Sequence, residues 1–421
     1  MSDKNYFQRI AARFAPAPKS APSVRGVPRT GNASDFDEFF HFRGRGGCQP
    51  LNARRIRAML ADADEGEPSE LAMLFSRILE SEPVIAAHLQ TRIFSVLACD
   101  WSIVAGETGS AAPEKIAEAA RILRAAGIQE LLRHLLSAVA FGYAGAAILW
   151  GEGGKDISGF KLFDPANFRF DLCGNPALVK ADGREKPFAE YHENQFVFHT
   201  HSLHRAIPSR GGLLRPLVWL FLFKYYAMRD RARYLERFGI PFIAAKIRNE
   251  DFESEAVRTE LMRSLAKLGS DGVGLLNEGA EMQLVSPSGS SSADYQTWLD
   301  YLDALCTRLI LGQTATSSDG NGFSGGAVQE NVRRDLVEAD CRGLADTVNR
   351  DILAPLERFR WGTEGTLAFH LDFAGPGNLL EKAQIVEKLS AAGAAVDPQW
   401  IEMTFGVALR RAETPENSSN N

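Results

Sequence analysis

The chain has 421 residues, of which 45% are hydrophobic and 24% are charged, and its formal net charge is −6. This length and composition predict a soluble globular protein of about two to three domains, and the negative charge argues against a protein that grips nucleic acid over a broad basic surface. The five cysteines are scattered without a CxxC pair, which argues against a disulfide framework or a zinc ribbon.

Residues 1–50 form the first segment, which is rich in proline, glycine and arginine and has no apolar periodicity. This composition predicts a flexible arm. Residues 51–210 follow, with three segments of helical apolar spacing and then a series of short apolar runs that turn residues separate. We therefore predict that 51–210 form one α/β or α+β domain.

The longest uncharged run of the chain extends from Leu135 to Trp150. It is shorter than the roughly 18 residues that a membrane-spanning helix requires, and Gly142 and Gly145 interrupt it. We predict a buried helix end, a glycine turn and a buried strand here, with membrane insertion as a minor alternative. The N-terminal residues 1–16 lack the apolar core of a signal peptide, so secretion is not expected.

Two long helices are predicted on either side of a small αβ insert. The first extends from about Leu213 to Phe238 and is apolar on nearly every face in its first half. The second is predicted over 294–311, where an apolar residue recurs every three or four positions. These apolar positions are Trp298, Leu302, Leu305 and Leu309. Antiparallel pairing of the two helices would make a stalk with the insert at its tip.

A glycine-rich segment, GQTATSSDGNGFSGG, follows the second helix and contains G-x-G-x-x-G at Gly320, Gly322 and Gly325. Binding of a dinucleotide requires a buried strand before the first glycine. The preceding spacing is helical instead, and a helix is also predicted afterwards, over 327–359. We therefore interpret the segment as a loop between two helices, and an oxidoreductase that uses GNGFSG remains the weaker alternative.

Three histidines in HTHSLH, namely His199, His201 and His204, are the other candidate for chemistry. H-x-H on a strand places two imidazoles on one face, which is a possible beginning of a metal site. No carboxylate lies within the motif, so we favour a strand end with outward polar residues over a metal hydrolase. Acidic residues of the two predicted helices on either side of the loop could also meet in a two-metal nuclease site, but solvated helix faces are normally this acidic.

Arg229, Arg233 and Arg237 recur at four-residue steps and are therefore predicted to share one face of the first long helix. Such a basic face can contact DNA or a partner. Alternatively, it can form salt bridges between helices or subunits with Glu236 and its neighbours, which is the commoner case. A plain DNA-binding protein is thus a further alternative, and it would bind duplex with strong salt dependence.

Most of the chain, from about Pro50 to Val407, resembles a portal protein of the Mu-like type from tailed phages. The most specific part of the resemblance is LILGQTATS followed by NVRRDLVEADCRGLADTVNRDILAPL. FGYAGAAILW and the run from HTHSLH to ERFGIPF resemble the centre of the family, and the segment from LNARRIR to DWSIV resembles its first helices and strand. The motifs occur in the family's order.

The resemblance implies an α+β portal fold and a ring that is dodecameric in the virion. It assigns 51–212 and 327–375 to a wing, 213–238 and 288–311 to the two stem helices, and 239–287 to a clip. The remaining segments are the flexible arm at 1–50, the loop at 312–326, and a short crown with a disordered tail at 376–421. DNA passes through the centre of such a ring, and the chain itself is expected to be neither an enzyme nor a holder of cofactors or metals.

The resemblance also implies particular sites and partners. The residues of the loop that are expected to face DNA are Thr316, Ser317, Ser318, Asp319, Asn321, Phe323 and Ser324. The residues of the clip that are expected to dock the large terminase or a head–tail adaptor are Arg248, Glu250, Arg258, Arg263 and Lys267. Capsid and scaffold proteins are further implied partners, and no membrane is involved. The expected location is the portal vertex of the virion, after assembly in the host cytoplasm.

Overall fold

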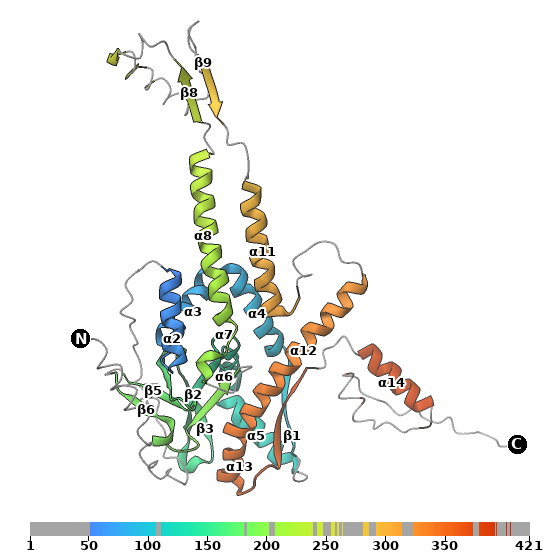
Figure 1. Ribbon diagram of the computed structural model, residues 1–421. Coiled ribbons are helices and arrows are strands. Elements are labelled where there is room, and N and C mark those ends of the chain that lie inside the picture. Colours follow the sequence, from blue (N-terminus) through green and yellow to red (C-terminus); the bar gives the residue numbers. More distant parts are fainter. Residues whose placement is uncertain are drawn as a thin grey trace, which may run out of the picture.

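The structure, a computed structural model, shows a broad body, a stalk of two helices that rises from it, and a strand pair beyond the stalk (Figure 1). It describes residues 51–106, 111–180, 183–201, 207–238, 242–246, 254–256, 259–260, 263, 281–285, 292–313, 323–373, 379–391, 393, 401 and 405. The predicted arm at 1–50 and most of the predicted tail lie outside these ranges. Within them, no helix combines the length and the apolar character that crossing a membrane requires.

Helices α2 to α7 form the first part of the body. Their bounds are α2 Ala53–Asp64, α3 Ser69–Ser81, α4 Pro83–Leu97, α5 Pro113–Ala125, α6 Ile128–Leu135 and α7 Ala138–Phe141. The amide N of Arg55 donates to Oδ1 of Asn52 at 2.9 Å, which caps α2. Buried apolar residues of α2, α3, α4 and α7 form one core with the lower parts of the stalk helices. The body therefore anchors the stalk through apolar packing.

The strands of the body are short and antiparallel. They are β1 Asp100–Ala105, β2 Tyr143–Trp150, β3 Ile157–Leu162, β4 Phe168–Phe170, β5 Pro176–Val179, β6 Glu185–Pro187, β7 Phe196–Thr200 and β10 Leu367–Asp372. The sheets have the orders β1-β10, β3-β2-β7 and β4-β5-β6. Ile103 of β1 pairs with Phe369 of β10, so a strand from the far end of the chain completes the body. The predicted glycine turn and buried strand within 135–150 are confirmed as Gly142 (φ 94°) and β2.

A π-helical segment, η6 Asn349–Leu353, ties two of these sheets together. The Asn349 side chain accepts from the Phe369 amide N at 2.6 Å and donates to the Phe369 carbonyl at 3.2 Å. Asp351 accepts from the Phe198 amide N at 3.0 Å, and Arg350 donates to the Phe198 carbonyl at 3.0 Å. These side chains therefore satisfy backbone groups at strand edges that would otherwise be unpaired.

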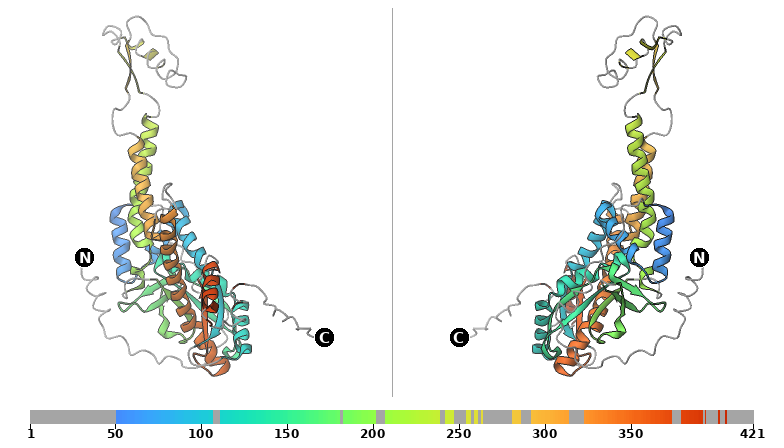
Figure 2. Two further views of the ribbon diagram at one scale, coloured as in Figure 1. Left: turned by 90° about the vertical axis from the view of Figure 1, so that its right-hand side faces the viewer. Right: turned by 90° about the vertical axis from the view of Figure 1, so that its left-hand side faces the viewer.

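The prediction of a stalk is confirmed by α8 Leu214–Phe238 and α11 Ser292–Leu311. The two helices pack antiparallel, because Lys224 contacts Asp303 whereas Arg231, farther along α8, contacts the earlier residue Gln296. In the side views of Figure 2 they lie one behind the other, and no other described helix lies beside their upper halves. Beyond them, β8 Phe242–Lys246 pairs with β9 Glu281–Val285, the only strands that the structure describes within the predicted insert.

The structure corrects two predicted boundaries beyond the stalk. The loop predicted at 312–326 ends earlier, because α12 extends from Phe323 to Val348; the two glycines at 325 and 326 lower helix propensity but do not prevent a helix. The single helix predicted over 327–359 is instead α12, η6 and α13 Ala354–Trp361. Pro355 explains this break, because it lacks the amide N–H that a regular helix would use at that position. Helix α14 Leu379–Ala391 follows β10.

Candidate functional site

Three charged side chains join the stalk to the body. Lys224 of α8 is 8% exposed, and its Nζ lies 2.5 Å from Oε1 of Glu82 at the start of α4 and 2.5 Å from Oδ1 of Asp303 on α11. Burial alone would lower the pKa of Lys224, but the hydrogen bonds to Asp303 and Glu82 outweigh it and the pKa is raised. The lysine therefore stays charged and holds the three helices together.

A second buried ion pair lies where α11 and α12 flank residues 314–322. Arg92 of α4 donates from Nε to Oδ2 of Asp340 at 2.7 Å and from Nη2 to Oδ1 at 3.0 Å. Its third donor, Nη1, reaches the carbonyl of Ile310 near the end of α11 at 3.1 Å. Arg92 and Asp340 are both buried. One arginine thus fixes the spacing between the last turn of α11 and the middle of α12.

Large apolar side chains remain exposed on the stalk. Phe223, Tyr225 and Met228 of α8 are 50%, 50% and 53% exposed, and Trp298 and Tyr301 of α11 are 46% and 52% exposed. The Trp298 and Tyr301 rings stack with their centroids 5.7 Å apart. A monomer in water gains nothing from this arrangement, because exposed apolar area of this kind is stabilising only when a partner covers it.

Helical geometry places these side chains on two different flanks. The direction from α8 to α11 is given by Lys224 and Arg231, which contact α11. At about 100° per residue, Phe223 lies roughly 90° to one side of it, and Met228 and Tyr225 lie roughly 50° and 110° to the other side. The same calculation for the antiparallel α11 puts Trp298 on the side of Phe223. We call Phe223 and Trp298 the first flank, together with Tyr301, which points away from α8 but stacks on Trp298. Tyr225 and Met228 are the second flank.

The predicted basic face lies on the side of α8 that points away from α11, since Arg229 and Arg233 are roughly opposite the contact direction at 100° per residue. Arg229 pairs with Asp230 at 2.9 Å and lies over the Tyr226 ring, and the more exposed Arg233 approaches Asp230 at 3.9 Å. Their ion pairs are therefore within α8. The side chain of Arg237 lies outside the described residues.

The predicted DNA-facing residues fall into two groups. Thr316, Ser317, Ser318, Asp319 and Asn321 lie outside the described residues, whereas Phe323 and Ser324 belong to the first turn of α12 rather than to a loop. At the other end, Gly312 ends α11 with φ 72°, and a Cβ there would lie 2.9 Å from Cγ1 of Val332. A glycine is thus required at the exit from α11.

Of the predicted clip residues, Arg263 is the one that the structure describes. It is exposed and pairs with Glu260, with Nη1 to Oε2 at 3.2 Å. Arg248, Glu250, Arg258 and Lys267 lie outside the described residues.

The histidine motif is engaged in packing. Nδ1 of His199 lies 2.8 Å from Oγ1 of Thr347 on α12, and burial, followed by the neighbouring His201, lowers the pKa of His199 to about 4. Burial likewise lowers the pKa of His201, although Asp340 opposes this. His204 lies outside the described residues. In the part of the chain that the structure describes, no three His, Cys, Asp or Glu side chains are grouped as a metal ion would require.

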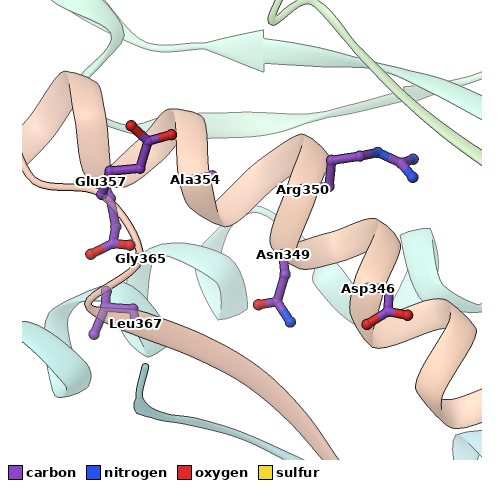
Figure 3. A pocket seen from close by; sticks show the side chains of 8 residues that line it. Asp346, Asn349, Arg350, Ala354, Glu357, Gly365 and Leu367 are labelled. Atoms are coloured by element: carbon purple, nitrogen blue, oxygen red, sulfur yellow. The ribbon is translucent and has the colours of Figure 1, made fainter. Parts of the chain in front are cut away.

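The rival dinucleotide site also lacks its strand, because the element before the glycines is α11. A cavity of about 360 Å³ lies elsewhere, beside η6 and α13 (Figure 3). Asp346 and Asn349 point to one side of the helix there, and Arg350 points away. Its lining also includes Glu357, which is buried against Lys115 with Nζ to Oε1 at 2.9 Å. Burial opposes ionisation of Glu357, but hydrogen bonds from Thr366 and Lys115 outweigh it and lower the pKa.

Sequence reasoning missed the residues that this geometry brings together. The partners Arg92 and Asp340 are 248 positions apart. Both lie in stretches that carry the family resemblance, but nothing in those stretches indicated that the two residues pair. The apolar spacing of α11 did mark Trp298, but it did not separate that residue from Leu302, which is buried. The signal that would have separated them is the presence of two apolar stripes on one helix, at different angles around its axis.

Comparison with known proteins gives a consistent result. The family described as "Portal protein of Mu bacteriophage" matches residues 72–407. The portal protein of Escherichia phage Mu is 28% identical over 370 residues, which cover 84% of this chain and 70% of that protein. The Mu-like prophage FluMu protein gp29 of Haemophilus influenzae is 27% identical over 369 residues, covering 84% and 69%. A similar fold is found in a chain from the neck of a native gene transfer agent particle, a structure computed with C12 symmetry. The TM-score is 0.58 and the sequence identity is 14%, and the match covers 83% of this chain and 94% of that chain.

Proposed function

The chain belongs to the family of Mu bacteriophage portal proteins, and from this premise we propose how its own residues build the channel. It is a structural, non-enzymatic component of a Mu-like phage or prophage, and it lies at the portal vertex of the virion, where the DNA channel is. The proposal is that copies of the chain assemble side by side into a ring through their stalks, with the segment after α11 facing the DNA.

The exposed apolar flanks of the stalk carry this proposal. Each stalk has apolar side chains on two different flanks, the first with Trp298 and Phe223 and the second with Met228 and Tyr225. A two-fold dimer would cover the same flank on both copies and leave the other flank exposed. A head-to-tail contact, in which the first flank of one copy meets the second flank of the next, covers both flanks. It gives a ring when the rotation between neighbours closes a full turn.

Residues 314–322 are proposed to line the channel. They contain Ser317, Ser318 and Asn321, whose weak hydrogen bonds exchange readily, and Asp319, whose charge repels phosphate. A channel that must let DNA slide requires such weak contacts, because a row of lysines or arginines would hold the phosphates. Phe323 and Ser324 now belong to α12, so we assign them to the base of this segment.

The remaining assignments follow the same plan. We propose that the stalk is the stem, that the segment at its tip is the clip, and that 51–212 with 327–375 form the wing. The tip would dock the large terminase during packaging and a head–tail adaptor afterwards, using Arg248, Glu250, Arg258, Arg263 and Lys267. Arg229 and Arg233 face away from α11, so in this ring they lie outside the contacts between neighbouring stalks. Capsid and scaffold proteins would contact the wing, and residues 376–421 would form a short crown.

Shortening the proposed channel segment should separate assembly from packaging. Deletion of residues 316–321 should leave ring formation intact, because the flanks of the stalk are unchanged, and should reduce packaged DNA per particle by at least about tenfold. Particle DNA measured by nuclease protection and rings counted by electron microscopy provide the two readouts. A variant that replaces the same six residues with Gly and Ser retains the length and should package closer to the normal level. Failure of the deleted chain to form rings would contradict the placement of this segment.

A further inference from the structure

Two cysteines meet where α4 packs against α12. Cys99 follows the end of α4, Cys341 lies in the middle of α12, and their Sγ atoms are 3.8 Å apart although 242 positions separate them in the chain. Both are free thiols. Cys341 is 1% exposed, whereas Cys99 is half-buried. Cys99 is therefore the more accessible residue of the pair.

Two further contacts hold the two helices together next to this pair. Arg92 of α4 binds Asp340, the neighbour of Cys341, and Arg333 of α12 donates to Oγ of Ser95 at 3.2 Å. The sulfurs consequently stay close without a covalent bond. A disulfide has an S–S length of about 2.05 Å, so an approach of under about 2 Å would complete the bond.

The hydrogen bond between the thiols assigns their order of reaction. Cys341 donates a hydrogen bond to the sulfur of Cys99, and this bond lowers the pKa of Cys99. Burial of Cys99 would raise that pKa, but the hydrogen bond has the larger effect. The same bond, followed by burial, raises the pKa of Cys341. Because a thiolate is the attacking species in thiol–disulfide exchange, Cys99 is the group that reacts first.

We propose that Cys99 and Cys341 form a disulfide once the protein leaves the reducing cytoplasm, and that this bond ties α12 to α4. With oxidised glutathione as the oxidant, the Cys99 thiolate attacks one sulfur of the glutathione disulfide and releases one glutathione thiolate. Cys341 then loses its proton to solvent and attacks the Cys99 sulfur, which releases the second glutathione. Two protein thiols are oxidised, and one glutathione disulfide is reduced to two thiols.

The bond would act on the helix that carries the proposed channel segment. Helix α12 begins at Phe323, directly after residues 314–322, and Cys341 lies five turns along it. In the cytoplasm the pair stays reduced, so α12 can adjust during assembly. In a released particle the bridge would hold the base of that segment in place. This timing rests on the proposed function as a virion component, whereas the formation of the bond does not.

Oxidation of the full chain by glutathione disulfide tests the proposal. In a Cys48→Ser/Cys173→Ser background three of the five cysteines remain. After oxidation, thiol titration of the protein unfolded without reductant should find one thiol, that of Cys306. Peptide mapping without reductant should give a peptide that links Cys99 to Cys341. The melting temperature should rise by at least about 4 °C on oxidation, and it should not change in a variant that also carries Cys99→Ser.

Three titratable thiols, counted after the oxidised protein is unfolded without reductant, would overturn the proposal, as would a stable mixed disulfide of glutathione at Cys99. Ring formation measured in reductant is a separate readout. If rings form in reductant but oxidation gives no Cys99–Cys341 bridge, this inference alone is refuted. If the bridge forms on oxidation but no rings form, the proposed assembly alone is refuted.

Discussion

Replacement of Trp298 by Glu should convert the assembled ring into monomers. Trp298 is 46% exposed on the first flank of the stalk, and an aromatic residue at the centre of an interface commonly contributes at least about 2 kcal/mol, or about thirtyfold in each association constant. A buried, unpaired carboxylate adds a desolvation cost. Native mass spectrometry and light scattering at matched concentrations would measure the change. The fold itself should remain, because the side chain is half exposed in the monomer.

Two further variants make this test specific. Met228→Glu, on the second flank, should have the same effect, because each contact joins the first flank of one copy to the second flank of the next. Arg233→Glu places the same new residue on the same stalk, but on the side of α8 that points away from α11, and should assemble normally. Normal rings from Trp298→Glu would show that the first flank is not an interface between copies.

Replacement of Asp340 by Ala should lower the free energy of unfolding by about 3–5 kcal/mol, because it leaves the buried charge of Arg92 without its partner. The loss should also free the carbonyl of Ile310 from its fixed donor, since Arg92 would no longer be oriented. Urea unfolding of the chain, kept monomeric by Trp298→Glu, would measure the effect without a contribution from assembly.

An exposed pair on the same helix serves as the control. Arg342 pairs with Glu338 one turn away, and the Arg342 side chain is 70% exposed. Arg342→Ala should therefore lower the free energy of unfolding by under about 1 kcal/mol. The double variant Arg92→Leu/Asp340→Leu should recover much of the loss, because no charge is then buried alone. Equal, small effects from Asp340→Ala and Arg342→Ala would contradict the view that the buried pair fixes α12 against α4.

Sequence periodicity was sufficient for the parts of the fold that local forces determine. The first long helix was predicted from Leu213 to Phe238 and is observed from Leu214, because a continuous apolar pattern specifies a helix without reference to distant residues. Pairing of β1 with β10 could not be predicted, since nothing local indicates which distant strand completes an edge. A single helix was predicted over 327–359, through Pro355, because apolar periodicity alone does not reveal the π-helical turn that precedes this proline.

The candidate site was predictable in outline and not in its contacts. The sequence marked a polar, glycine-rich segment between two helices, yet the two glycines at 325 and 326 placed its end about four residues too late, because α12 begins at Phe323. The flanks of the stalk needed the structure, because Leu302 packs inward and Trp298 points outward from the same apolar series. Leu302 is buried and Trp298 is exposed because of where α4 and α8 pack against α11, and this packing cannot be inferred from local sequence.

Electron microscopy of the purified chain, with native mass on the same sample, tests the central claim most directly. The account predicts closed rings with a central hole wide enough for duplex DNA. It also predicts that the stalks of neighbouring copies meet flank to flank. A uniform population of two-fold dimers that pair the same flank would contradict it.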